Sequence, residues 1–256
     1  MKYYSDENFV LFLDDSFEKL KEIKEKSVDM IFADPPYFLS SDGFTCSGGK
    51  KVSVNKADWD KSVSLAEKHE FNRKWISLCK RVLKDNGTLW ISGTMHNIYS
   101  VGMALEQEGF KIINNITWRK TNPPPNLSCR YFVHSTETVL WAKLDTPKAK
   151  HVFNYDIMRK MNGNKQDKDV WSSPVISTKE KVFGKHPTQK PLWLLEKIIL
   201  ASTEKDAVIL DPFNGSGTTG IAARKLGRKY IGIDNVEEYL GITVRRLEEL
   251  KHEKKL

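Results

Sequence analysis

Short apolar runs alternate with amphipathic helical segments along almost the whole chain, and this alternation constrains the fold more than any other feature. The runs are apolar throughout, as in strands that are buried on both faces of a parallel sheet. We expect an α/β fold with a Rossmann-like, doubly wound, mostly parallel sheet of seven strands. The expected strands are residues 9–13, 28–33, 88–92, 111–118, 137–144, 207–213 and 229–234.

The segments between these strands predict helices and one long loop. Ser16 is expected to cap the first helix. Residues 38–60 lack periodicity and are rich in Gly and Ser, so we expect a mobile loop there. The helical patterns are residues 16–26, 70–84, 98–109, 191–203, 218–227 and 236–253.

The length of 256 residues suits a single domain, and its charge is unevenly spread. The chain has 41 Lys or Arg against 33 Asp or Glu, a net charge of +8. Residues 145–185 hold nine basic and five acidic residues, which is half of that excess. We expect a small basic insertion at 145–185 within one domain, residues 1–256. A polyanionic partner would explain the charge, and a solvated basic surface is the alternative.

Other classes are disfavoured by simple observations. Three widely spaced cysteines argue against a disulfide framework and a zinc site, and fit a reducing cytoplasm. No apolar run approaches the roughly 18 residues of a membrane span, and the N-terminal stretch has acids inside it, unlike a secretory signal. We therefore expect a cytoplasmic protein with no membrane association.

A glycine-rich turn follows the strand at 207–213. The sequence DPFNGSGTTG places Gly215, Gly217 and Gly220 in a G-x-G-x-x-G pattern that opens a helix. The next strand ends at Asp234, 23 residues after Asp211, close to the spacing of a ribose-binding acid. These features predict a site for a ligand that carries a ribose. The alternative is a structural glycine turn with an acid that caps the following helix.

A nicotinamide dinucleotide and S-adenosylmethionine both carry a ribose. Only 22 residues follow Asp234, so the rest of the sheet must come from upstream, unlike the usual order of a dinucleotide fold. Asp211 and Asn214 flank the turn, which favours a cationic amino-acid group over a pyrophosphate. The sequence therefore favours S-adenosylmethionine.

The tetrapeptide Asp34-Pro35-Pro36-Tyr37 ends the strand at 28–33. Ligands of parallel sheets bind beyond the carboxyl ends of strands, so we expect Asp34 to lie near Asp211 and Asp234. A carboxylate and a backbone carbonyl can accept both N–H groups of an exocyclic base amine and aim it at a methyl donor. The prolines fix that backbone, and Tyr37 could stack on a base flipped out of a duplex.

These motifs resemble those of the permuted β group of DNA amino-methyltransferases, whose fold is that of class I S-adenosylmethionine-dependent methyltransferases. In that family D-P-P-Y comes first, a target-recognition segment follows, here 145–185, and the cofactor loop comes last, 177 residues after Asp34 here. More narrowly, "WRKTNPPPNLSCRYFVHSTETVLWAK" and "KHEFNRKW" resemble the GATC-modifying second methyltransferases of Dpn-type restriction systems.

The resemblance implies roles for particular residues. The catalytic residues would be Asp34, Pro35, Pro36 and Tyr37. "DDSF" and "GKHPTQKP" resemble elements that contact the adenine and the methionine moiety of the cofactor. The cofactor-binding set would be Asp15, Asp34, His186, Thr188, Gln189, Asp211, Pro212, Phe213, Gly215, Ser216, Gly217, Thr218 and Asp234.

Basic residues in two segments are the expected DNA contacts. The family places the proline-rich segment near the active-site cleft, so Arg119, Lys120 and Arg130 are candidates, and solvated side chains are the alternative. Arg159, Lys160 and Lys165 belong to the basic insertion. Trp90, Trp118 and Trp141 fall on expected strands, where core packing is the better interpretation.

We therefore expect a DNA adenine-N6 methyltransferase of a restriction-modification system that acts on GATC, uses S-adenosylmethionine and needs no metal. Cytosine-N4 methylation is the nearest alternative, although that chemistry usually accompanies Ser at position 34. RNA methyltransferases, a nicotinamide dehydrogenase and a non-catalytic DNA-binding protein are more remote. The expected substrate is double-stranded DNA, with single strands left open. The expected oligomeric state is a monomer or a weak homodimer.

Overall fold

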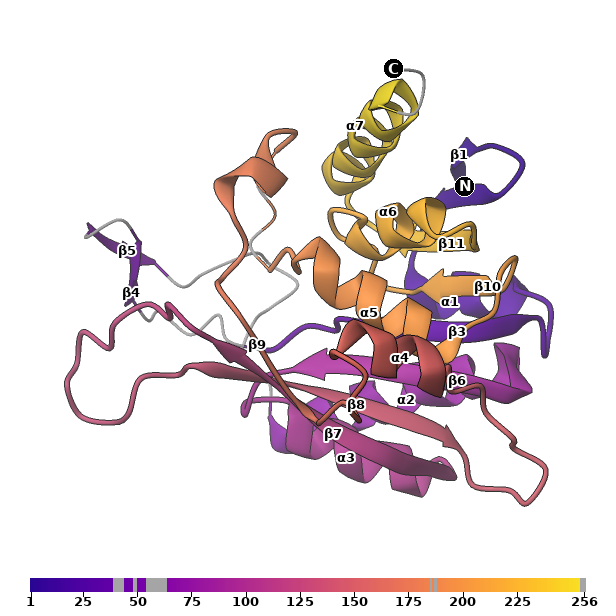
Figure 1. Cartoon of the computed structure of the whole chain (residues 1–256), viewed down its shortest axis with the longest axis horizontal. Coiled ribbons are helices and arrows are strands. Elements are labelled where there is room, and N and C mark those ends of the chain that lie inside the picture. Colours follow the sequence, from indigo (N-terminus) through magenta and orange to yellow (C-terminus); the bar gives the residue numbers. More distant parts are fainter. Residues whose placement is uncertain (39–43, 48–49, 54–63, 185, 187, 254–256) are drawn as a thin grey trace.

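The computed structural model of the chain describes residues 1–38, 44–47, 50–53, 64–184, 186 and 188–253. A nine-stranded sheet with the order β1-β2-β11-β10-β3-β6-β8-β7-β9 forms its centre (Figure 1). Neighbouring strands are parallel, except that β1 is antiparallel to β2 and β8 is antiparallel to β6 and β7. The strands are β1 (Lys2–Ser5), β2 (Phe9–Leu13), β3 (Val28–Ala33), β6 (Leu83–Gly93), β7 (Phe110–Lys120), β8 (Thr136–Leu144), β9 (Val170–Ser173), β10 (Val208–Asp211) and β11 (Lys229–Asp234).

The expected strand number of seven is wrong, although all seven expected strands are present. The two additional strands, β1 and β9, lie at the two edges of the sheet and have four residues each. Their side chains are mostly exposed or half-buried, so neither strand carries the apolar run that marks the central strands. A strand that is buried on both faces can be recognised in a sequence by its apolar run. An edge strand is only partly buried, so it has no such run.

Helices cover both faces of the sheet (Figure 1). Alternate residues of β3 enter two separate cores. Met30 and Phe32 pack with residues of α5, α6 and α7, whereas Ile31 and Ala33 pack with residues of α1, α2 and α3. None of the described helices is long and apolar enough to cross a membrane. The helices are α1 (Ser16–Glu22), α2 (Leu65–Val82), α3 (Ile98–Gln107), α4 (Tyr155–Met161), α5 (Leu192–Ser202), α6 (Thr218–Lys225) and α7 (Glu237–Glu253).

Three tryptophans fill the centre of the sheet, as the sequence predicted. Trp90 and Trp141 face each other across the β6–β8 pair, with stacked rings whose centroids are 4.7 Å apart. Trp118 is also buried, and its indole N–H donates to Ser173 Oγ at 2.9 Å. These rings belong to the core and are not available as a binding surface.

The carboxyl ends of β3, β10 and β11 meet at one edge of the sheet. β10 pairs in parallel with both β3 and β11, with Ile209 opposite Met30 and Leu210 opposite Ile231. Asp34 follows β3 directly, Asp211 ends β10 and Asp234 ends β11. The expectation that these three acids share one edge is therefore confirmed.

The segment 145–185 is connected to the main sheet. It contains α4, the edge strand β9 and a 3-10 helix, η2 (Thr178–Lys181). β9 pairs with β7, while the backbone N–H of Asn154, just before α4, donates to Ala201 O at 2.9 Å near the end of α5. Since α5 starts beside the edge formed by the carboxyl ends of the strands and leads into the start of β10, its end and α4 lie toward the amino ends of the strands (Figure 1).

The expected loop at 38–60 contains regular structure. β4 (Phe44–Ser47) and β5 (Lys50–Ser53) form a two-stranded antiparallel sheet. Strands of four residues are too short for a period to be recognised in the sequence. The other residues of the expected mobile loop, 39–43, 48–49 and 54–60, lie outside the described residues.

Candidate active site

A pocket with about 990 Å³ of free space, counted out to its open mouth, lies at the carboxyl edge of the sheet. The structure brings together every expected cofactor residue except Gly217. The lining residues expected from the sequence are Asp15, Asp34, Pro36, His186, Thr188, Gln189, Asp211, Pro212, Phe213, Gly215, Ser216, Thr218 and Asp234.

The glycine turn lets the backbone form one wall of this pocket. Gly215 and Gly217 have φ values of +51° and +74°, which L side chains rarely adopt. A Cβ on Gly215 would lie 3.1 Å from the His186 ring, and one on Gly217 would lie 2.3 Å from Thr243. Gly217 therefore allows α7 to pack against the turn, which explains why it does not line the pocket.

Asp211 and Asp234 are buried carboxyls that hold the turn. Asp211 accepts hydrogen bonds from the Phe213 N–H at 3.0 Å and from Thr219 Oγ1 at 2.6 Å. Asp234 accepts from the N–H groups of Gly215, at 2.7 Å, and Val236, at 2.9 Å. Burial raises the pKa of Asp211 to about 7 and the pKa of Asp234 to about 6. Both groups thus titrate close to neutral pH.

Asp15 lies at the start of α1, beside the turn. Its Oδ1 accepts hydrogen bonds from the N–H groups of Phe17 and Glu18, so Asp15 is the N-cap and the expected cap, Ser16, is wrong. Ser16 is the first helical residue, and its hydroxyl donates to the Pro212 carbonyl. This contact ties α1 to the glycine turn.

Aromatic rings cover another wall. Phe71 of α2 lies 5.3 Å from Phe17 and 6.4 Å from Phe213, measured between ring centroids. All three residues line the pocket, next to Asp15. Of these rings, the sequence reasoning identified only Phe213. Phe71 and Phe17 are on helices with ordinary amphipathic patterns that carry no separate signal.

The segment before α5 closes the pocket from the other side. His186 is buried, and its ring packs edge-on against Tyr239 with centroids 4.4 Å apart. Gln189 Nε2 donates to the Glu180 carbonyl at 2.6 Å. Among the described residues, no donor reaches the buried Oε1 of Gln189. The hydrogen bond to the Glu180 carbonyl holds Gln189 in the pocket wall, while its Oε1 is buried.

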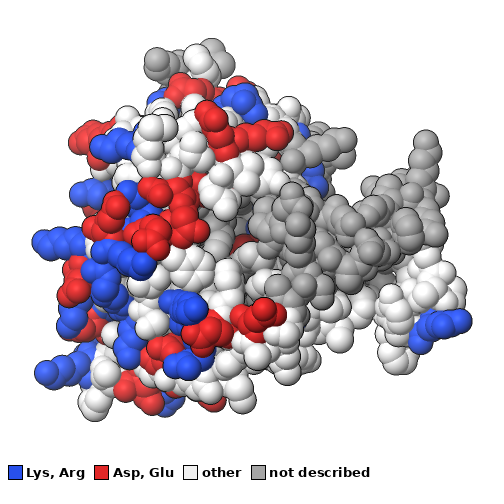
Figure 2. Space-filling view, turned by 180° about the vertical axis from the view of Figure 1, so that it is seen from behind, with Lys and Arg blue, Asp and Glu red and all other residues white. Residues whose placement is uncertain are grey.

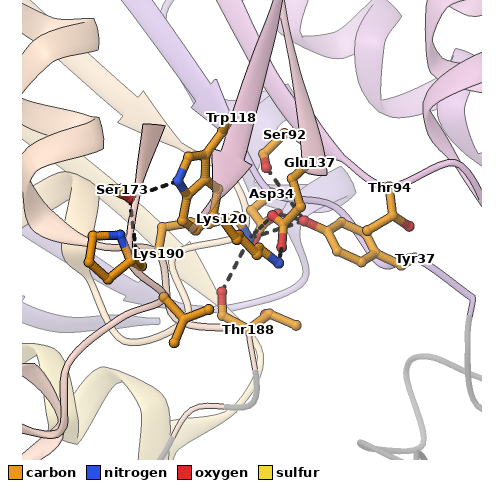
Figure 3. Close-up of polar contacts among 12 residues, drawn as sticks. Asp34, Tyr37, Ser92, Thr94, Trp118, Lys120, Glu137, Ser173, Thr188 and Lys190 are labelled. Atoms are coloured by element: carbon orange, nitrogen blue, oxygen red, sulfur yellow. Dashed lines mark hydrogen bonds and ion pairs between the residues drawn. The ribbon is translucent and has the colours of Figure 1, made fainter. Parts of the chain in front are cut away.

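Asp34 is a buried residue of the pocket lining, in contact with two partners. Tyr37 donates its hydroxyl to Oδ1 at 2.5 Å, and Lys190 donates to Oδ2 at 2.5 Å (Figure 3). Burial raises the pKa of Asp34, and the Lys190 ammonium group acts in the opposite direction. Tyr37 is itself buried, and the neighbouring Ser92 hydroxyl lies 3.4 Å from its oxygen. In this arrangement the Tyr37 hydroxyl orients Asp34.

The two prolines fix the backbone beside Asp34. Asn97 Nδ2 donates to the Pro36 carbonyl at 3.0 Å, and Asn97 Oδ1 accepts from Asn72 at 2.7 Å. Both asparagines are buried, so this carbonyl is held from the α2–α3 layer. Pro35 lies between the two anchored residues, Asp34 and Pro36.

Lys190 and Glu137 are the functional candidates that the sequence reasoning missed. Lys190 is 6% exposed and lies between two carboxylates, 2.5 Å from Asp34 Oδ2 and 3.7 Å from Glu137 Oε2. Lys120 contacts the other oxygen of Glu137 at 2.5 Å. Lys190 belongs to the quoted "GKHPTQKP", so its sequence position was visible. Glu137 had no comparable signal because the pairing depends on how β8 approaches β3.

The expected DNA contacts do not form one surface. Lys120 is largely buried against Glu137, whereas Arg119, near the end of β7, and Arg130, within the β7–β8 connection, are exposed. Arg159 and Lys160 on α4, and Lys165 just after it, lie near the end of α5 and away from Asp34. The role of these last three residues in DNA binding stays a prediction.

Comparison with known proteins identifies the family. The family model described as DNA methylase, for N6 and N4 methyltransferases, matches residues 28–245. The chain belongs to this family. It is 63% identical over 246 residues to the type II methyltransferase M2.DpnII of Streptococcus pneumoniae, covering 96% of this chain and 92% of that protein. It is 53% identical over 245 residues to M2.MboI of Moraxella bovis, covering 96% and 89%.

Solved structures agree with this assignment. The crystal structure of the M1.HpyAVI–SAM complex matches with a TM-score of 0.71 and 31% identity, over 93% of this chain and 98% of that one. The cytosine-N4-specific PvuII DNA methyltransferase matches with a TM-score of 0.74 and 19% identity, over 95% and 87%. The second likeness shows the fold alone.

Proposed function

We propose that the protein is an S-adenosylmethionine-dependent DNA methyltransferase that modifies N6 of adenine in GATC. The observation that carries the proposal is the position of Asp34, a buried carboxylate of the pocket lining, held by Tyr37 and Lys190. A carboxylate accepts hydrogen bonds and cannot donate them, which suits an amino group as its target. The family assignment and the relatives of type II restriction systems support the same conclusion.

The pocket residues fit the cofactor. Among the described lining residues, four carboxyl side chains, those of Asp15, Asp34, Asp211 and Asp234, stand against one lysine. Such a lining favours a cationic ligand and opposes the pyrophosphate of a nicotinamide dinucleotide. S-adenosylmethionine supplies an activated methyl group on a positively charged sulfur.

Each part of the cofactor has residues that suit it. Asp15 and the rings of Phe17, Phe71 and Phe213 suit the adenine, since aromatic rings stack on bases. Asp234 suits the ribose as a hydrogen-bond acceptor. Asp211 and the segment His186 to Gln189 suit the amino-acid end. Gly215 has no side chain, so a ligand can lie against the backbone of the turn. A Cβ at this position would also press on the His186 ring.

Asp34 acts on the target base. An exocyclic amine is a weak nucleophile because its lone pair is delocalised into the ring. Hydrogen bonds from its N–H groups to Asp34 and to a backbone carbonyl of the proline pair localise that lone pair and orient it. The proline rings keep this backbone from moving. Lys190 and Tyr37 keep the carboxylate in place before the base arrives.

We place the DNA beside the β7–β8 connection, residues 121–135. This connection leaves the sheet at the edge where the carboxyl ends of β3, β10 and β11 meet (Figure 1). From Arg119 to Thr136 the chain has no acidic residue. Phe132 is 96% exposed and Tyr131 is 58% exposed, as expected for rings that stack on bases. Val175 N donates to Asn122 Oδ1 at 2.8 Å, so the segment after β9 supports this connection.

The face of the sheet that α1, α2 and α3 cover is a poor candidate for DNA binding. On the face seen in Figure 2, basic and acidic side chains are interspersed. Many of them pair with each other on α1–α3, as Arg73 does with Glu108 and Lys21 does with Glu18. Paired charges of both signs do not build the positive field that attracts a polyanion.

Analysis of the methylated base tests the proposal. Duplex DNA is incubated with the protein and methyl-labelled S-adenosylmethionine, then digested to nucleosides and separated. We expect the label in N6-methyl-2′-deoxyadenosine. Label in N4-methyl-2′-deoxycytidine would replace adenine by cytosine as the target, and no transfer to any DNA would reject the methyltransferase activity. The variant Asp34→Asn, which keeps the shape of the side chain, is the control and should transfer no label.

A further inference from the structure

Both oxygens of Asp34 are already engaged before any base is bound. Tyr37 occupies Oδ1 and Lys190 occupies Oδ2, each at 2.5 Å (Figure 3). If Asp34 accepts a hydrogen bond from the target amine, as the proposed function requires, the amine must share an oxygen with one of these partners or displace that partner. Tyr37 is fixed by its place in the chain, three residues from Asp34, and by its burial. Lys190 has a long, flexible side chain, so it is the partner able to move.

A second carboxylate is already within reach of Lys190. Nζ lies 3.7 Å from Glu137 Oε2, and the Thr188 carbonyl accepts a hydrogen bond from it at 3.2 Å. Rotation about the last bonds of the side chain would bring Nζ closer to Glu137. Glu137 is held in place by Lys120, which contacts its other oxygen at 2.5 Å. The ammonium group therefore has a charged acceptor on each side.

We propose that Lys190 is a positioning residue that keeps Asp34 ionised in the resting enzyme and passes to Glu137 when the target base enters. Asp34 Oδ2 then becomes available to the N6 amino group. The inference rests on the proposed function and adds two residues to it. Lys190 acts through Asp34 and does not itself touch the reacting atoms.

The charges around Asp34 explain why it needs such a partner. Asp34 and Lys190 are both buried, with side chains 12% and 6% exposed. Burial raises the pKa of Asp34, Glu137 raises it further, and Lys190 lowers it. The charged and titratable groups around the Asp34–Lys190 pair are Tyr37, Glu137, Lys120 and Asp211. Without Lys190, Asp34 would protonate nearer neutral pH, and the neutral acid is a weaker acceptor that also carries a donor hydrogen.

The pH profile of catalysis tests this role, because a merely structural role would not move it. The parameter kcat/KM for DNA is measured at saturating S-adenosylmethionine from pH 6 to 9 for the wild type, Lys190→Met and Lys190→Arg. We expect Lys190→Met to shift the acidic limb to higher pH by at least about one unit, so that its loss of activity is about tenfold greater at pH 6.5 than at pH 8.5. Lys190→Arg keeps the charge and should keep the wild-type position of the limb.

Glu137→Gln should shift the acidic limb of the pH profile in the opposite direction. Removing this negative neighbour should move the acidic limb to lower pH, while kcat falls because the ammonium group no longer has a second carboxylate to move to. A loss of activity in Lys190→Met that is equal at every pH would overturn the proposal. So would a shift of both variants in the same direction.

A measurement that needs no activity separates this inference from the proposed function. The carboxyl pKa of Asp34 is followed by isotope-edited infrared spectroscopy in the wild type and in Lys190→Met. A higher pKa in the variant supports the role of Lys190, and an unchanged pKa overturns it. If the wild type transfers no methyl group to DNA, the proposed function fails, whatever the infrared result. If the wild type is active and the pKa does not move, only the inference fails.

Discussion

At the scale of single residues, Asp34 separates cofactor binding from chemistry. It lines the cofactor pocket but is committed to Tyr37 and Lys190. We expect Asp34→Ala to lower methyl transfer by at least about 100-fold, as for other groups that stabilise a reacting centre, and to change the Kd of S-adenosylmethionine by less than about tenfold. Calorimetric titration and a transfer assay on the same preparation measure both. A loss of cofactor affinity as large as the loss of activity would contradict the assigned role.

Asp211 is the residue whose titration should accompany cofactor binding. Its pKa of about 7 means that it is largely protonated at pH 6.5, and Asp234, with a pKa of about 6, is protonated in part. A cationic ligand beside these carboxyls stabilises their charged forms, lowers both pKa values and drives protons off. Binding at pH 6.5 should therefore release protons and should strengthen as the pH rises through 6 and 7.

Calorimetry in buffers of different ionisation enthalpy counts these protons. We expect a net release at pH 6.5 in the wild type and a smaller release in Asp211→Asn, which cannot ionise. Thermal unfolding of both proteins without ligand is the control for folding. An observed enthalpy that does not depend on the buffer would contradict the account of these two acids.

At the scale of elements, the β7–β8 connection and α4 are alternative candidates for the segment that binds DNA. Arg130 belongs to the connection and Arg119 to the end of β7 that leads into it, whereas Arg159 and Lys160 lie on α4 near the end of α5. We expect Arg119→Gln with Arg130→Gln to reduce the slope of log K against log salt by about one for each phosphate that no longer has a cationic partner. The matched pair Arg159→Gln with Lys160→Gln removes the same charge. If the slope falls only in the double variant of α4, the DNA binds at the basic insertion, residues 145–185, and not at the β7–β8 connection.

The same connection presents rings to solvent with a defined local structure. Asn126 Nδ2 donates to the Tyr131 carbonyl at 2.6 Å, and Asn126 Oδ1 accepts from the Ser128 N–H at 3.0 Å. Phe132, 96% exposed, forgoes about 1.5–3 kcal/mol of burial in the free protein. Such a ring is explained if it stacks on a base in the complex.

Phe132→Ala tests that explanation. Stacking of one base contributes about 1–3 kcal/mol, so DNA affinity should fall roughly 5- to 150-fold. Fluorescence anisotropy with labelled duplex at fixed salt measures the affinity. Ile157→Ala removes another exposed apolar side chain, 40% exposed on α4, and should leave the affinity unchanged. Equal losses in both variants would remove the stacking role.

Element by element, the sequence predicted strands where burial imposes an apolar run and missed them where it does not. β3 and β10 are buried on both faces and were evident. β1 and β9 belong to the edges, where half the surface faces solvent and the residues are mixed. The cap of α1 was placed one residue late because Asp15 and Ser16 are both good N-cap residues, and only the geometry distinguishes them.

At the scale of the whole molecule, the parallel sheet made the cofactor pocket predictable. Asp34, Asp211 and Asp234 each follow a buried strand, so topology alone brings them to one edge. Glu137 comes from β8, an antiparallel strand, at its amino-terminal end. It reaches the same edge because β8 runs in the reverse direction, and its pairing with Lys190 depends on side-chain packing that no local pattern records.

The most direct test of the whole account is to sequence DNA from cells that express this chain, by a method that detects modified bases and their context. Cells that express Asp34→Asn serve as the matched background. We predict N6-methyladenine at GATC sites on both strands in the wild-type sample and none above background in the variant. Methylcytosine, or methylated adenine in both samples alike, would contradict the claim that Asp34 directs methyl transfer to adenine. Methylated adenine in another sequence would overturn GATC alone.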